Sequence, residues 1–159
     1  MNETDYDYKS MIDEAASLLT QLEGRLLLQF LTHIVEPEFN AAYLVLEDGV
    51  FSIHGRVGGE VLQIILVNEA PPESAETNAA VKLFAPFSIF LNRRIVQARS
   101  IGSAWNGHGF ELSFEGLPDR TMIVQSIYAG EKPPDFDDCL RFGIGFYIFD
   151  ARSDMRGSV

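Results

Sequence analysis

The chain has 159 residues, of which 47% are hydrophobic and 22% are charged, and its formal net charge is −11. This composition is typical of a globular domain with a hydrophobic core and excludes a disordered chain, which would be poorer in apolar residues. The acidic excess argues against general nucleic-acid binding, which needs Lys and Arg to neutralise phosphates, and against docking on anionic membranes.

The first predicted element is helical and covers residues 8–35. Apolar residues recur there at spacings of three and four, from Ile12 to Ile34. Gly24 marks a point where a first helix could end and a second begin. Residues 26–35 are also compatible with a buried strand, but we expect a helix.

Residues 42–67 show the period-two pattern of β-strands. In the middle of this region Phe51 and Ile53 alternate with polar residues, so one face should be buried and the other wetted. The dipeptides Asp48-Gly49 and Gly58-Gly59 suit tight hairpins. Three consecutive antiparallel strands are therefore predicted, over 43–46, 50–57 and 61–67.

The rest of the chain is predicted to be a loop, a β-rich part and a tail. The Pro-rich segment 68–79 is the expected loop, and residues 80–150 are the β-rich part. The expected features of that part are a strand over 81–91 broken at Pro86, a hairpin of 110–115 with 121–128, and a last strand over 144–150. Residues 151–159 form a polar tail. We predict a single α+β domain, with the N-terminal helical segment packed on a mostly antiparallel sheet of about six to eight strands.

The N-terminus and the cysteine content favour a cytoplasmic protein. Cys139 is the only cysteine, so no internal disulfide can form, as is usual in a reducing compartment. Residues 1–10 hold three acidic residues and one Lys, without the basic start and apolar run of a secretory signal.

No pattern indicates a metal, a cofactor or a catalytic centre. Glycine-rich phosphate-binding motifs are absent. His108 and Glu111 are three apart on an expected strand and should face opposite sides. The acidic run that begins at Asp135 lacks the Gly and Glu of a calcium loop. The potential zinc ligands lack zinc-type spacing: His33, His54, His108 and Cys139. The sequence therefore favours a protein that is not an enzyme and that needs no cofactor.

One group of polar residues is a candidate ligand-binding patch. His54 and Arg56 lie two apart on one face of the predicted middle strand, and Gln63 follows on the next strand. Together they could bind an anion. The alternative is that they form the solvent face of a hairpin.

The charge is uneven along the chain. Residues 1–60 hold eleven acidic and three basic residues, whereas residues 61–109 hold three acidic and four basic ones. A surface complementary to a basic partner would raise the association rate, although acidity can also serve solubility alone. The candidate partner-binding residues are Glu3, Asp5, Asp7, Asp13, Glu14, Glu36, Glu38, Glu47 and Asp48, with Trp105 as an anchor.

These observations favour a binding protein that recognises a basic protein partner, a toxin or an effector. In size, acidity and α+β character the chain resembles, in general outline, the immunity proteins of bacterial toxin systems. Two alternatives remain. One is an acidic secretion chaperone, a class that the chain departs from after residue 67, where we predict strands. The other is a small-ligand enzyme or sensor with a site near His54 and Arg56.

Overall fold

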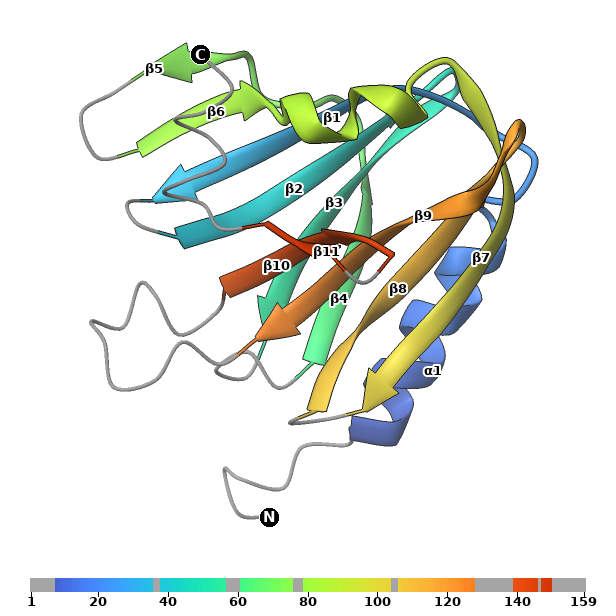
Figure 1. Cartoon of the computed structure of the whole chain (residues 1–159). Helices are drawn as coiled ribbons and strands as arrows, with labels where there is room; N and C mark the ends of the chain where they lie inside the picture. Colours follow the sequence, from blue (N-terminus) through green and yellow to red (C-terminus); the bar gives the residue numbers. More distant parts are fainter. Residues whose placement is uncertain are drawn as a thin grey trace.

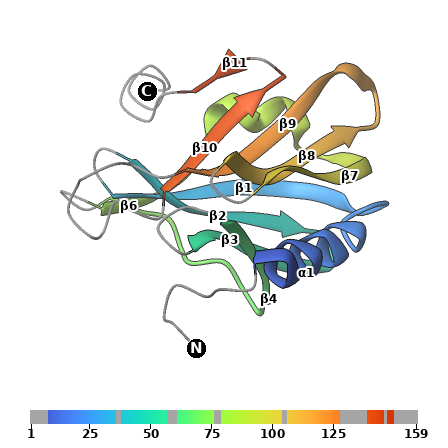
Figure 2. The ribbon, with the colours of Figure 1, turned by 90° about the horizontal axis from the view of Figure 1, so that it is seen from below.

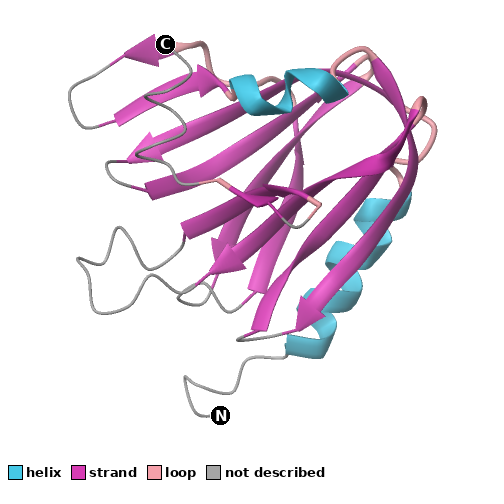
Figure 3. Ribbon diagram, in the orientation of Figure 1, coloured by secondary structure: helices cyan, strands magenta, loops and turns pink. Residues whose placement is uncertain are grey.

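The computed structural model of the protein describes residues 8–35, 38–56, 61–75, 79–103, 106–127, 139–145 and 147–149. Its described part contains one α-helix, α1 (Tyr8–Thr20), one 3-10 helix, η1 (Ala85–Phe90), and an eleven-stranded sheet (Figure 3). The predicted antiparallel sheet and N-terminal helix are confirmed. The protein is nevertheless mostly β, so α+β describes it only roughly, and the sheet has more strands than the six to eight expected.

Six of the strands form an antiparallel barrel. The ring runs β2–β10–β9–β8–β7–β1 and closes because β1 also pairs with β2. From this ring β3 and β4 extend beyond β2, β6 and β5 extend beyond β1, and β11 pairs with β10 (Figure 1). The strands are β1 (Leu26–Val35), β2 (Glu38–Leu46), β3 (Gly49–Arg56), β4 (Val61–Val67), β5 (Ser74–Ala75), β6 (Ala79–Leu83), β7 (Arg93–Ser103), β8 (Asn106–Phe114), β9 (Leu117–Ile127), β10 (Cys139–Ile144) and β11 (Tyr147–Ile148).

Helix α1 fills the open side between β4 and β7 (Figures 1 and 2). Only two residue pairs join β1 to β7, so most of that edge of β7 has no neighbouring strand. Just after α1, the Glu23 carboxylate accepts a hydrogen bond from the backbone N–H of Ala98 over 3.0 Å, and the Gly24 N–H donates to the carbonyl of Ile95 over 2.8 Å. At Ile95 and Ala98 the edge of β7 is thus satisfied by the residues that follow the helix and not by a strand.

The prediction of a helix through residue 35 was wrong, because residues 26–35 form β1. Helix α1 ends at Thr20, and Gly24 follows with a positive φ of 86°. Leu31 and Thr32 are neighbours in sequence and both are buried, so both faces of β1 are covered there. A short apolar run buried on both faces has no alternation, and its residues alone do not distinguish strand from helix.

Three further boundaries differ from the predictions. The broken strand over 81–91 is β6 followed by η1, with Pro86 in the first turn of the 3-10 helix. In place of the last strand predicted over 144–150, β10 begins at Cys139 and ends at Ile144. Gly145 then turns the chain with a φ of 58°, and the short β11 follows. The loop over 68–79 contains the short β5. The hairpins β2–β3–β4 and β8–β9 are confirmed.

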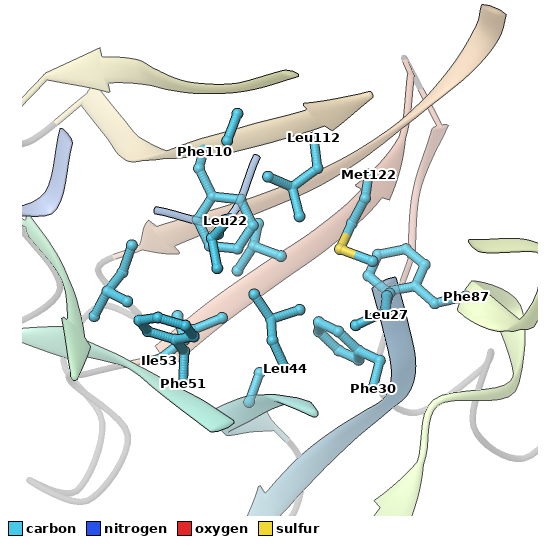
Figure 4. Close-up of a cluster of buried hydrophobic side chains, with 14 of the residues drawn as sticks. Leu22, Leu27, Phe30, Leu44, Phe51, Ile53, Phe87, Phe110, Leu112 and Met122 are labelled. Atoms are coloured by element: carbon cyan, nitrogen blue, oxygen red, sulfur yellow. The ribbon is translucent and has the colours of Figure 1, made fainter. Parts of the chain in front are cut away.

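The core lies inside the barrel and reaches beneath α1. Figure 4 shows Leu22, which follows α1, among side chains from both walls, including Phe51 of β3 and Phe110 of β8. At one side η1 adds Phe87, whose ring lies 4.8 Å from that of Phe30 in an edge-on arrangement. This packing explains how one helix and two facing walls share a single core.

Candidate functional site

The structure brings Arg56 and Gln63 together. His54 pairs with Gln63 across β3 and β4, and Arg56 lies two residues after His54 on the same face. The Arg56 guanidinium donates a hydrogen bond to the Gln63 side-chain oxygen over 2.7 Å. The three polar side chains of the sequence-predicted patch therefore share one sheet face, at the end of β3 and the start of β4.

His54 also lines a shallow hollow on this face. Its ring Nε2 lies 3.2 Å from the Ser52 hydroxyl, and its ring stands perpendicular to that of Tyr43 at 6.4 Å. The segment after β4, including Glu69 and Pro71, completes a hollow of about 410 Å³. Partial burial raises the pKa of Tyr43, so this phenol stays protonated well above neutral pH.

A smaller hollow of about 120 Å³ lies between α1 and the hairpin of β3 and β4, and we call it the α1–β4 hollow. Its floor consists of buried apolar residues: Ala15, Val61, Leu62 and Ile64. Its rim consists of more exposed residues: Met11, Glu14, Arg56 and Gln63. The helix and the hairpin that form it are some fifty residues apart, so no local sequence pattern indicated it.

The described acidic candidates differ in their surroundings. Asp13 on α1 accepts from Lys9 over 2.7 Å, in an exposed pair one helical turn apart. Glu14 lies at the rim of the α1–β4 hollow. Glu38 is the first residue of β2, and its side chain lies outside the described part.

Glu47 and Asp48, in the turn between β2 and β3, pair with basic residues of the protein itself. Glu47 lies 3.1 Å from Arg94 of β7, and Asp48 lies 3.7 Å from Arg25. Arg94 also donates to the carbonyl of Gly24 over 3.0 Å. The turn is thereby tied to β7 and to the start of β1, which is a structural use of both carboxylates.

The remaining partner-binding candidates lie outside the described residues: Glu3, Asp5, Asp7, Glu36 and Trp105. The strands that flank several of these positions are described, however. Val35 pairs with Glu38 and with Ala79, and Ile127 pairs with Cys139. The strand ends on either side of these segments therefore lie close together.

These strand ends lie at one end of the barrel, which extends from the left side to the bottom of Figure 1. β1, β3, β7 and β9 finish there, and α1, β2, β4, β6, β8 and β10 begin there. The sequence segments entered and left at this end are 1–7, 36–37, 57–60, 76–78, 104–105 and 128–138. Together they hold ten acidic residues and one Lys. We call the described strand ends that flank these segments the acidic end, after the sequence of the segments.

The body of the protein is close to neutral by comparison. Its described residues hold eleven acidic and nine basic side chains. The opposite end carries the turns at Gly24, Asp48 and Gly116, and there Glu47 and Asp48 are paired with arginines. The excess of acidic residues therefore belongs to the part of the sequence outside the described ranges.

His108 and Glu111 face opposite sides of β8, as predicted. His108 is fully buried, and its Nδ1 accepts from the Leu62 N–H over 2.9 Å. Glu111 lies on the outer face, where it pairs with Arg99 and accepts from the Thr121 hydroxyl over 2.7 Å. Burial raises the pKa of Glu111, but the hydrogen bonds from Thr121 and Arg99 and the charge of Arg99 outweigh it and lower that pKa.

Within the described ranges, no three His, Cys, Asp or Glu side chains gather in a way that could hold a metal ion. Cys139 is buried at the start of β10. No helix of the described part combines the length and the apolar character needed to cross a membrane. Comparisons of the chain with protein-family models, with curated proteins and with solved structures gave no match.

Proposed function

We propose that this protein is a non-enzymatic binding protein that recognises a basic protein partner through its acidic end, in the manner of an immunity or inhibitor protein. The observation that carries the proposal is the acidity of the sequence segments that link the strands at the acidic end. Ten acidic residues and one Lys occupy the segments entered at one end, whereas Glu47 and Asp48 at the other end pair internally with Arg94 and Arg25.

Acidic residues that served only to keep the protein soluble would not need to be concentrated in particular segments. Like charges that gather at one end of a small barrel repel one another, which costs stability. Acidic residues at one end of a protein create a directional field that attracts and orients a basic partner, and such a field raises the association rate at low ionic strength. The separation therefore favours recognition over solubility.

This proposal changes the roles of the candidate residues. Asp5, Asp7 and Glu36 keep the partner-binding role, because they belong to segments that the chain enters or leaves at the acidic end. Glu47 and Asp48 have a structural role at the opposite end. A basic toxin that is bound and neutralised is the partner that fits best.

The test is equilibrium and kinetic binding to the basic protein encoded by a neighbouring gene, measured over a series of salt concentrations. We expect the affinity to fall with salt, and the reversal of Asp5, Asp7, Glu36 and Glu60 to Lys to slow association at least tenfold. The matched control reverses four exposed acidic residues of the described part, which should change the association rate less than twofold: Glu69, Glu73, Glu115 and Asp119. No complex at micromolar concentrations and low salt, or equal effects of the two sets, would contradict the proposal.

The hollow beside His54 favours one second candidate, a small-ligand enzyme or sensor. Ser52 and His54 are within 3.2 Å of each other, and Tyr43 lies beside them on the same face. Ser52 is 3% exposed, however, so its hydroxyl offers little surface to a substrate. A small-molecule screen of the unchanged protein and of a His54→Ala variant tests this candidate. If the variant retains full partner affinity and binds the same compounds equally well, the candidate is removed.

A further inference from the structure

One strand connection crosses the sheet and forms a hollow that the recognition of a basic partner does not use. Residues 68–73, which we call the strap, join β4 to β5. In the sheet these two strands stand on opposite sides of β3, β2, β1 and β6, so the strap has to cross the strands between them. It crosses the face that points away from the core, because Glu69 and Pro71 line the same hollow as Ser52 and His54.

The hollow between the strap and the sheet, which we call the strap hollow, has the size of a small-molecule site. Its volume is about 410 Å³, within the range of about 300–1,000 Å³ that is usual for ligand sites. Its lining offers surface to a ligand, since Glu69 and Pro72 are exposed and Tyr43 and His54 are half-buried. A ligand can therefore reach both the strap and the sheet.

The walls of the strap hollow suit a flat apolar group. Pro71 and Pro72 contribute two rings from the strap, and Tyr43 contributes an aromatic ring from β2. The two prolines restrict the backbone of the strap, so a ligand loses less affinity to the ordering of this segment. On the sheet side, the contact of 3.2 Å between the Ser52 hydroxyl and the His54 ring holds that ring in place.

The charge of the lining favours a cation. Glu69 supplies the one carboxylate among the lining residues, and it forms no ion pair with a residue of the described ranges. Arg56 follows His54 by two residues but does not line this hollow, and it donates to Gln63. An aromatic ring and an unpaired carboxylate bind organic cations through cation–π contacts and charge-assisted hydrogen bonds. The net charge of −11 adds a general attraction for cations.

We infer that the strap hollow binds a small organic cation, in which an amidinium, guanidinium or ammonium group is attached to a flat apolar body. The cationic group binds at the carboxylate of Glu69, and the apolar body packs between Tyr43 and the two prolines. This site gives the protein a second binding activity. It does not depend on the recognition of a basic partner, so the failure of either proposal leaves the other standing.

The first experiment compares three probes of similar shape and different charge. Benzamidine is a cation, benzamide is neutral and benzoate is an anion. Each is titrated into the full chain while the ring resonances of Tyr43 and His54 are followed by NMR, and the exposed Tyr147 reports nonspecific contact. We expect saturable shifts with benzamidine, about fivefold weaker binding of benzamide, and no saturation with benzoate. The inference is wrong if benzamidine does not saturate these shifts, or if either of the other probes binds as tightly.

The second experiment changes the carboxylate. Glu69→Gln removes the charge of the lining and should reduce the affinity for benzamidine to that for benzamide. Glu73→Gln is the matched control, because it removes an exposed carboxylate of the same strap that does not line the hollow, and it should leave the affinity unchanged. Both side chains are exposed, so neither change should disturb the fold. Equal affinities of the two variants for benzamidine would overturn the inference.

Discussion

The Nδ1 atom of His108 accepts a hydrogen bond from the backbone N–H of Leu62 over 2.9 Å, and this bond joins β8 to β4. Both residues are buried, so the imidazole satisfies an amide at the edge of β4 that water does not reach. Because Nδ1 accepts, the neutral ring carries its proton on Nε2, for which the described residues offer no hydrogen-bond partner. On the same face, the neighbouring residues Phe110 of β8, Ser126 of β9 and Leu140 of β10 are buried and uncharged.

The first prediction is that the protein loses stability as the pH falls through the range in which free histidine titrates. Burial lowers the pKa of His108 below its ordinary value of 6.5. The unfolded chain therefore takes up the proton first, and the contribution of His108, complete above pH 6.5, declines as the pH falls through that value towards the lower folded pKa. Urea unfolding between pH 8 and pH 5 measures it.

A matched variant separates this effect from other titrations. In His108→Asn the side-chain oxygen can accept from Leu62 but does not titrate, so the loss between pH 7 and pH 5 should shrink. His108→Ala leaves the Leu62 amide without its acceptor and should cost about 1–3 kcal/mol at pH 8. An unchanged pH profile in His108→Asn would show that other groups control this range.

The second prediction concerns Glu23 at the edge of β7. Its carboxylate accepts from the Ala98 N–H over 3.0 Å, in a position where a neighbouring strand would otherwise pair. Glu23→Ala should destabilise the protein by about 1–3 kcal/mol, because a hydrogen bond to a charged acceptor is lost. Hydrogen exchange at the Ala98 amide should accelerate, while exchange at Leu112 on β8 provides the control. Unchanged exchange at Ala98 would contradict the role of Glu23.

The third prediction concerns acid. The lowered pKa of Glu111 means that its contribution to stability is present above its ordinary value of 4.5 and is lost as the pH falls through the folded value. Glu111→Gln removes this titration and should cost about 1 kcal/mol at pH 7, since Arg99 is largely exposed. Unfolding curves measured at pH 7 and at pH 3 check this. The free energies of unfolding of the two proteins should differ at pH 7 and become equal at pH 3.

The fourth prediction compares two glycines. A Cβ atom at Gly109 would lie 1.9 Å from the carbonyl oxygen of Val124, across the β8–β9 pairing. Gly109→Ala should cost at least about 3 kcal/mol, because the backbone cannot yield without breaking the ladder. Gly24 has a positive φ of 86° but open space around it, so Gly24→Ala should cost only about 1 kcal/mol. Similar losses in thermal unfolding would contradict this comparison.

Local patterns predicted a large part of this fold. The alternation around Phe51 and the turn residues at Asp48-Gly49 predicted the first hairpins, since both act between neighbours in sequence. The same rule placed His108 and Glu111 on opposite faces of β8. The assignment of residues 26–35 failed because β1 pairs with β2, β6 and β7, and no local pattern encodes those neighbours.

The candidate site was predicted in part, for the same reason. The shared face of His54, Arg56 and Gln63 followed from the strand period and one hairpin. The α1–β4 hollow did not, because Met11 and Leu62 meet only after α1 closes the open side of the barrel.

By itself the sequence determined the net charge of −11, the strand-rich middle and the turn at Asp48-Gly49, while the turn predicted at Gly58-Gly59 lies outside the described residues. It also predicted that the acidity was directional, but assigned that direction to the first sixty residues. The tertiary structure decided which strand ends lie together. Antiparallel pairing brings the strand ends that flank segments 36–37, 57–60 and 128–138 to one end of the barrel, whereas Glu47 and Asp48 meet Arg94 and Arg25 at the other. Electrostatic fields depend on distances in space, and only the closed sheet sets those distances.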